Sequence, residues 1–147
     1  MLAVSMRETA NIETVRAVYA AFGRGDVAGV LDRLDETIVW ITPGSAAVPM
    51  AGRRQGIDEV RKFFEQLAQR LTFTVFQPRE FLAQGNRVIA LVHYEGRDNT
   101  TGRPFRAESA MLWTIGNGRA VRFQEYTDTE ALAEAARPND LQAHRAG

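Results

Sequence analysis

Three segments in the first half of the chain repeat apolar residues at every third or fourth position, which predicts amphipathic helices. The first begins near Ser5 and Glu8, which have the spacing of a capping box, with Thr9 and Asn11 as alternative caps. Asp26 is expected to cap a short second helix, and a third follows it. The apolar positions of the three segments are Ile12, Val15, Val18, Tyr19 and Phe22; Val27, Val30, Leu31 and Leu34; and Ile57, Val60, Phe63, Phe64 and Leu67.

Shorter segments rich in β-branched and aromatic residues predict strands. One of them, 37–42, precedes the third helix, and the segment 45–56 that follows it is predicted to be a loop because it contains proline and glycine. The remaining strands follow the third helix and are separated by turns, among which 116–118 (Gly-Asn-Gly) is a strong hairpin signal. They are expected at 71–81, 87–95, 106–115 and 120–127, before a short final helix at 131–136. Helices followed by strands favour an α+β fold in which helices cover one face of an antiparallel sheet.

The later strands carry apolar residues on both faces, which bears on the oligomeric state. Ile89 and Leu91 alternate with Val88, Ala90, Val92 and Tyr94, and Met111 and Trp113 alternate with Ala110 and Leu112. An antiparallel sheet in a monomer usually presents one polar face to water. We therefore expect a homodimer that buries the second face.

Composition narrows the possible functions. The 147 residues suit a single domain, 1–147, with an ordered core at about 8–136 and a mobile C-terminal tail. Basic and acidic residues balance at 18 each, which does not favour binding to nucleic acid or to an acidic membrane surface. No segment has the apolar length of a signal peptide or a spanning helix, so a cytoplasmic protein is expected. The absence of cysteine and the two distant histidines argue against a metal site, and no cofactor motif is present.

Several short motifs recur in the same order in SnoaL-like proteins of the nuclear-transport-factor-2-like superfamily. They are Tyr19-Ala20-Ala21-Phe22, Gly25-Asp26, Trp40, Pro43-Gly44, Ala51-Gly52, Gly56, Phe63-Phe64, Thr101-Gly102 and Glu125-Tyr126-Thr127-Asp128. The chain resembles this family over roughly 12–128. The resemblance implies a cone-shaped, cystatin-like domain in which a curved sheet wraps an N-terminal helix and the open end forms a ligand pocket. It also implies dimers through the convex face of the sheet.

Ketosteroid isomerase belongs to the same superfamily and needs a carboxylate base, a tyrosine and a protonated aspartic acid. An alignment with it places the tyrosine at Val18, the base at Thr42 and the aspartic acid near Ala110. None of these three side chains can replace the group it is aligned with. We therefore predict that the chain is not a ketosteroid isomerase.

The same alignment, with the alternation of side chains along a strand, indicates which residues face the inside of the cone. Two are carboxylates on neighbouring strands, Glu125 and Glu108, and they are the candidate catalytic residues, with Glu125 the first choice as base. The expected substrate-binding residues are Trp40, Thr42, Val18, Phe22, Phe64, Tyr94, Ala110, Leu112 and Phe123. His93 has the opposite parity and is expected to point away from the cone, toward the dimer face.

These residues leave three functions open. Two carboxylates in an apolar cavity could supply an acid and a base near neutral pH, as an isomerase, cyclase, hydratase or epoxide hydrolase requires. The chain could instead be a non-catalytic module that binds a small apolar molecule, or a dimeric accessory domain with no small ligand. Either glutamate could equally lie at the rim in water or pair with an arginine such as Arg106, and the aromatic residues could simply form the core.

Overall fold

Within residues 5–138, which the computed structural model describes, four helices and six strands form an α+β fold. In chain order they are α1 (Met6–Gly23), α2 (Val27–Leu31), β1 (Leu34–Thr42), β2 (Gly52–Gln55), α3 (Ile57–Arg70), β3 (Leu71–Gln84), β4 (Arg87–Asp98), β5 (Pro104–Gly116), β6 (Arg119–Tyr126) and α4 (Thr129–Ala136). The expected α+β class is confirmed. Residues 139–147 of the predicted mobile tail lie outside the described residues.

Local sequence signals explain where the helices begin. The backbone N–H of Glu8 donates to the Ser5 hydroxyl at 3.0 Å, and the N–H of Ser5 donates to the Glu8 carboxylate at 2.9 Å, so the predicted capping box is present. Asp26 caps α2 by accepting from the N–H of Gly29 at 2.9 Å. The second helix is shorter than its apolar pattern suggested, because Leu34 already belongs to β1.

The strands form one sheet in the order β2-β1-β6-β5-β4-β3. The expectation of a purely antiparallel sheet is wrong at one point: β1 pairs parallel with β6, whereas every other neighbouring pair is antiparallel. The chain returns to β1 only after α3 and the β3–β5 meander, a connection long enough for a parallel pair. The strand β2 lies inside the predicted loop 45–56; it is a short edge strand without an apolar pattern.

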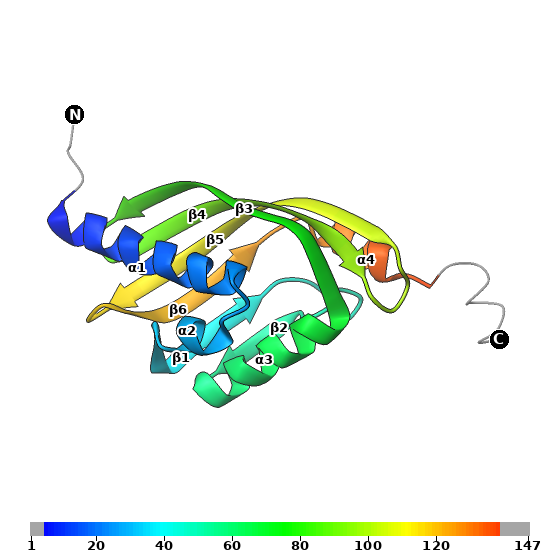
Figure 1. Ribbon diagram of the computed structural model, residues 1–147, viewed down its shortest axis with the longest axis horizontal. Helices are drawn as coiled ribbons and strands as arrows, with labels where there is room; N and C mark the ends of the chain where they lie inside the picture. Colours follow the sequence, from blue (N-terminus) through cyan, green and yellow to red (C-terminus); the bar gives the residue numbers. More distant parts are fainter. Residues whose placement is uncertain (1–4, 139–147) are drawn as a thin grey trace.

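Figure 1 shows the long strands β3, β4 and β5 curving over the helices, with α1 and α3 on the same side of the sheet. Register shifts at two points of the β3–β4 pair accompany this bend. Helix α1 packs against β3 and β4, α3 packs against β1, β2 and β3, and α4 packs against β4 and β5. No helix within 5–138 is long and apolar enough to span a membrane.

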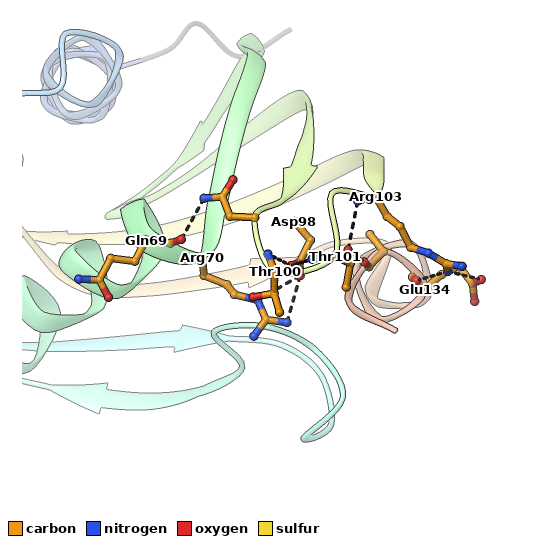
Figure 2. Close-up of polar contacts among 9 residues, drawn as sticks. Gln69, Arg70, Asp98, Thr100, Thr101, Arg103 and Glu134 are labelled. Atoms are coloured by element: carbon orange, nitrogen blue, oxygen red, sulfur yellow. Dashed lines mark hydrogen bonds and ion pairs between the residues drawn. The ribbon is translucent and has the colours of Figure 1, made fainter. Parts of the chain in front are cut away.

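A polar network joins α3, the β4–β5 turn and α4 (Figure 2). Asp98, which is fully buried, accepts from Arg70 Nε at 3.1 Å and from the backbone N–H of Thr100 at 2.8 Å. The next residue of that turn, Thr101, donates its hydroxyl to the carbonyl of Ala135 in α4 at 2.6 Å. The network thereby holds α4, whose Leu132 reaches the interior cavity.

Candidate functional site

A cavity of about 100 Å³ lies between the helices and the face of the sheet that they cover, here called the inner face. Its wall is almost entirely apolar and rich in aromatic side chains. Segments distant in sequence build it: α1, α3, the inner face, the 43–50 loop and α4. The lining residues are Val18, Tyr19, Phe22, Val30, Trp40, Thr42, Pro43, Val48, Pro49, Met50, Phe63, Phe64, Leu67, Leu71, Phe73, Phe76, Tyr94, Met111, Trp113, Phe123, Glu125 and Leu132.

Glu125, near the end of β6, is the one carboxyl group among these lining residues. Its Oε2 accepts a hydrogen bond from the Ser109 hydroxyl at 2.9 Å and one from the Tyr94 hydroxyl at 3.1 Å. Burial raises the pKa of the Glu125 carboxyl above its ordinary value of 4.5, and these two hydrogen bonds oppose the rise. The structure thus places a carboxyl with a raised pKa in the wall of an apolar cavity.

The two partners of Glu125 have defined orientations of their own. The Tyr94 hydroxyl donates to Glu125 and also lies 2.7 Å from Thr127 Oγ1. Because Tyr94 has a single hydroxyl proton, Thr127 is the donor in the second contact. Burial, and then the charge of Glu125, raise the pKa of Tyr94, which keeps the phenol protonated as a donor. Ser109 is buried and also lies 3.3 Å from the carbonyl of Tyr126. These contacts hold Oε2 and leave Oε1 without a hydrogen-bond partner among residues 5–138.

The aromatic wall contains a second set of polar groups. Trp113 donates its indole N–H to the Tyr19 hydroxyl at 3.0 Å, and that hydroxyl lies 3.1 Å from the sulfur of Met111. Trp40 stacks on Phe123 with ring centroids 4.0 Å apart and meets Trp113 edge to face. In contrast to Trp113, the buried indole N–H of Trp40 has no hydrogen-bond partner within the described residues.

Thr42 borders the cavity but has a structural role in its wall. Its hydroxyl donates to the carbonyl of Met50 and accepts from Arg54 at 3.2 Å. Arg54 also donates to the Met50 carbonyl at 3.0 Å and lies over the Phe63 ring. These contacts attach the loop that follows β1, which brings Val48, Pro49 and Met50 to the cavity.

The structure brings most, but not all, of the expected site residues together. Eight of them line the cavity: Val18, Phe22, Trp40, Thr42, Phe64, Tyr94, Phe123 and Glu125. The expected orientation of β5 is wrong, because Glu108, Ala110 and Leu112 lie on the opposite face, here called the outer face. The residues of β5 that alternate with them, Ser109, Met111 and Trp113, are the ones on the inner face.

The inward face of β5 was predicted wrongly because it was taken from a single aligned position, Ala110. Because side chains alternate, a shift of one residue moves every side chain of a strand to the other face. The sequence contains a signal for the correct face: two large apolar side chains of that strand, Met111 and Trp113, share parity with Ser109. The inner residues beside Ala110 are a serine and a methionine, so the corrected register supplies no aspartic acid at the isomerase position.

Glu108 lies instead in a charged cluster on the outer face. Its Oε1 is 2.6 Å from Nδ1 of His93 and 3.7 Å from Arg79. Glu95 is 2.6 Å from the other ring nitrogen of His93. Hydrogen bonds to the carboxylates of Glu95 and then Glu108 raise the pKa of His93. His93 therefore lies away from the cavity, as its parity indicated, and no group of metal-binding side chains occurs within the described residues.

The curved sheet, the helices that cover one face and the cavity between them define an α+β pocket protein of the nuclear-transport-factor-2-like superfamily. Residues 15–123 match the sequence model of the SnoaL-like domain, and the chain belongs to that family.

Known proteins resemble the chain over nearly its whole length. A solved NTF2-like protein of Burkholderia xenovorans LB400 is 32% identical, with a TM-score of 0.82, over 92% of this chain and 100% of that one. The solved protein TerC is 28% identical, with a TM-score of 0.78, over 86% of this chain and 98% of that one. An uncharacterized protein of Mycobacterium tuberculosis is 26% identical over 130 residues, which are 88% of this chain and 98% of the relative.

Proposed function

We propose that the chain is a cofactor-independent acid/base enzyme that acts on a small apolar molecule, with Glu125 as the group that carries the proton. One observation supports this function above all: a carboxyl with a raised pKa forms part of an otherwise apolar cavity wall. A general acid or base works best when its pKa lies near the pH of the reaction, and burial moves a carboxyl in that direction.

The contacts of Glu125 suit proton transfer at one oxygen. Ser109 and Tyr94 both bond Oε2, so Oε1 is the oxygen from which a proton can pass to or from a molecule in the cavity. The apolar wall lowers the local dielectric constant, which strengthens electrostatic interactions between Glu125 and a bound substrate. The reaction class fits an isomerase, cyclase, hydratase or epoxide hydrolase, and the side chains at the ketosteroid isomerase positions argue against that one activity.

A binding module for a small hydrophobic ligand is the second candidate. The solved relative TerC was co-crystallized with polyporic acid, so a protein 28% identical to this chain accommodates a small molecule. In that case Glu125, Tyr94 and Ser109 would orient the ligand without changing it. The apolar lining supports binding in both candidates, and only the fate of the ligand distinguishes them.

The test is the exchange Glu125→Gln, which keeps the shape of the side chain and removes its acid/base chemistry. Wild-type protein would be incubated in D2O with a panel of small cyclic enones and epoxides, and product formation and C–H exchange would be followed by NMR. Removal of a general base typically costs about 10²–10⁴-fold in rate, and we expect a loss of that size in Glu125→Gln. The matched control is Glu108→Gln, the same exchange on the outer face, which should keep full activity.

Two results would contradict the proposal. Full activity of a folded Glu125→Gln protein would exclude Glu125 as the proton carrier. A ligand that binds the wild-type protein and is recovered unchanged, with no exchanged protons, would favour the binding module instead.

A further inference from the structure

The indole N–H of Trp40 is the most unusual polar group in the cavity wall. Among the buried side-chain nitrogen and oxygen atoms of residues 5–138, Trp40 Nε1 alone has no hydrogen-bond partner. The residue is 4% exposed and borders the cavity. A buried donor without an acceptor is unfavourable, and such a group in a folded protein calls for an explanation.

Trp113 provides an internal comparison. It lies beside Trp40 in the same wall, with ring centroids 5.7 Å apart, and its N–H is paired with the Tyr19 hydroxyl at 3.0 Å. Residues 5–138 therefore supply an acceptor to one of the two tryptophans and none to the other. Because Trp40 also borders the cavity, a molecule bound there is the candidate acceptor.

We propose that the Trp40 indole N–H donates a hydrogen bond to an uncharged oxygen of the bound molecule, so that the ligand is a small ring compound with a carbonyl or ether oxygen. This inference deepens the proposed function and rests on it, because it assumes that the cavity is the binding site. It assigns Trp40 a role in selecting the ligand, which is separate from any proton transfer at Glu125.

The wall of the cavity supports an uncharged ring rather than an anion or a chain. Trp40, Phe63, Phe64 and Phe123 present aromatic faces and edges with centroid distances of 4.0–5.6 Å between neighbouring rings, which suits contact with a flat ring. No lysine, arginine or histidine is among the described lining residues, so the wall offers no cation to an anionic ligand. The carboxyl of Glu125 would also repel a second carboxylate.

The sheet register separates Trp40 from Glu125, so that the two side chains can contact different parts of one ligand. Trp40 on β1 pairs with Phe123 on β6, and Glu125 is the next inner residue after Phe123. With strands about 4.8 Å apart and a rise of about 3.3 Å per residue, the Cα atoms of Trp40 and Glu125 are about 8 Å apart. A single ring can therefore direct its oxygen toward Trp40 and present another part of its skeleton to Glu125.

The experiment uses the unmodified protein labelled with 15N in its indoles, titrated with cyclohexanone and with methylenecyclohexane, two probes of similar shape. The spectrum contains two indole N–H signals, and the variant Trp40→Phe identifies the one from Trp40. We expect cyclohexanone to move the Trp40 indole proton downfield, as a new hydrogen bond does, while methylenecyclohexane leaves it near its free position. We also expect Trp40→Phe to weaken cyclohexanone binding about five- to tenfold more than methylenecyclohexane binding.

Each alternative outcome is distinguishable. Equal responses of the Trp40 signal to both probes, or equal losses of affinity in Trp40→Phe, would overturn the inference and leave the binding cavity in place. A long-lived water that stays on the Trp40 N–H while cyclohexanone is bound would overturn it as well. Failure of both probes to bind would instead count against the proposed function, and against this inference with it. If Trp40→Phe does not fold, the variant Trp113→Phe identifies the Trp40 signal by elimination, and the wild-type titration still decides the inference.

Discussion

At the scale of single residues, Glu125 makes the stability of the protein depend on pH. Its folded-state pKa lies above the ordinary 4.5, so between these two values the folded protein holds a proton that the unfolded chain releases. The contribution of Glu125 is therefore fully present below about pH 4.5 and is lost as the pH rises through the folded-state pKa.

The exchange Glu125→Gln should remove this dependence. We expect the free energy of unfolding of the variant, relative to wild type, to increase steadily as the pH rises from 4.5 through the folded-state pKa. Urea denaturation from pH 4 to 8 measures the difference, and the exposed Glu65→Gln serves as the control. A difference that stays constant over this range would show that burial does not shift the Glu125 pKa.

A site residue could be predicted from the sequence only where the inward-facing side of its strand was assigned correctly. In β4, β6 and β1 the alignment and the alternation of side chains together predicted that Tyr94, Phe123 and Trp40 face inward, and all three line the cavity. Ser109 was missed because the register of β5 was taken from one aligned position. The catalytic role of Glu125 stays a prediction, and a sequence pattern cannot show the burial that raises its pKa.

At the scale of elements, the Asp98 network connects α3, the β4–β5 turn and α4 (Figure 2). We expect Asp98→Ala to lower the free energy of unfolding by about 2–3 kcal/mol, because the turn amides and the Arg70 guanidinium lose a buried acceptor. Urea denaturation measures this loss. Glu13→Ala, which removes an exposed ion pair within α1, should change stability by less than about 0.5 kcal/mol.

A loss below about 1 kcal/mol in Asp98→Ala would mean that water replaces the carboxylate at this turn.

The helices were easier to predict than this network, since caps and apolar spacing are local signals. The contact between Thr101 and Ala135 joins residues 34 positions apart in the sequence, and no local pattern indicates it. The edge strand β2 was missed for a related reason, because its pairing with β1 is all that defines it.

At the scale of the whole molecule, the outer face of the sheet suggests a homodimer. Apolar side chains from four strands share this face: Leu82, Ile89, Leu91, Ala110, Leu112 and Tyr126. Leu82 and Tyr126 are about half exposed, at 50% and 52%. We propose that a second copy of the chain covers this surface, as the apolar pattern on both faces of the strands indicated.

Leu112→Glu should convert the dimer into a folded monomer, because a charge at the centre of an apolar interface is costly to bury. Light scattering coupled to size-exclusion chromatography gives the mass, and circular dichroism checks the fold. Ala20→Glu, an exposed position on α1, is the matched control and should remain a dimer. A wild-type monomer, or a dimer that survives Leu112→Glu unchanged, would exclude this interface.

The amino-acid sequence by itself determined the α+β class, the helix boundaries set by caps, the strands and turns of the β3–β6 meander, and the apolar nature of the interior. Those features follow from local propensity and from the period of apolar residues. Only the tertiary structure decided the parallel pairing of β1 with β6, the face that β5 presents, and the hydrogen bonds from Ser109 and Tyr94 to Glu125. Pairing and register depend on contacts between segments far apart in the chain, and burial of a carboxyl depends on all the elements that surround it.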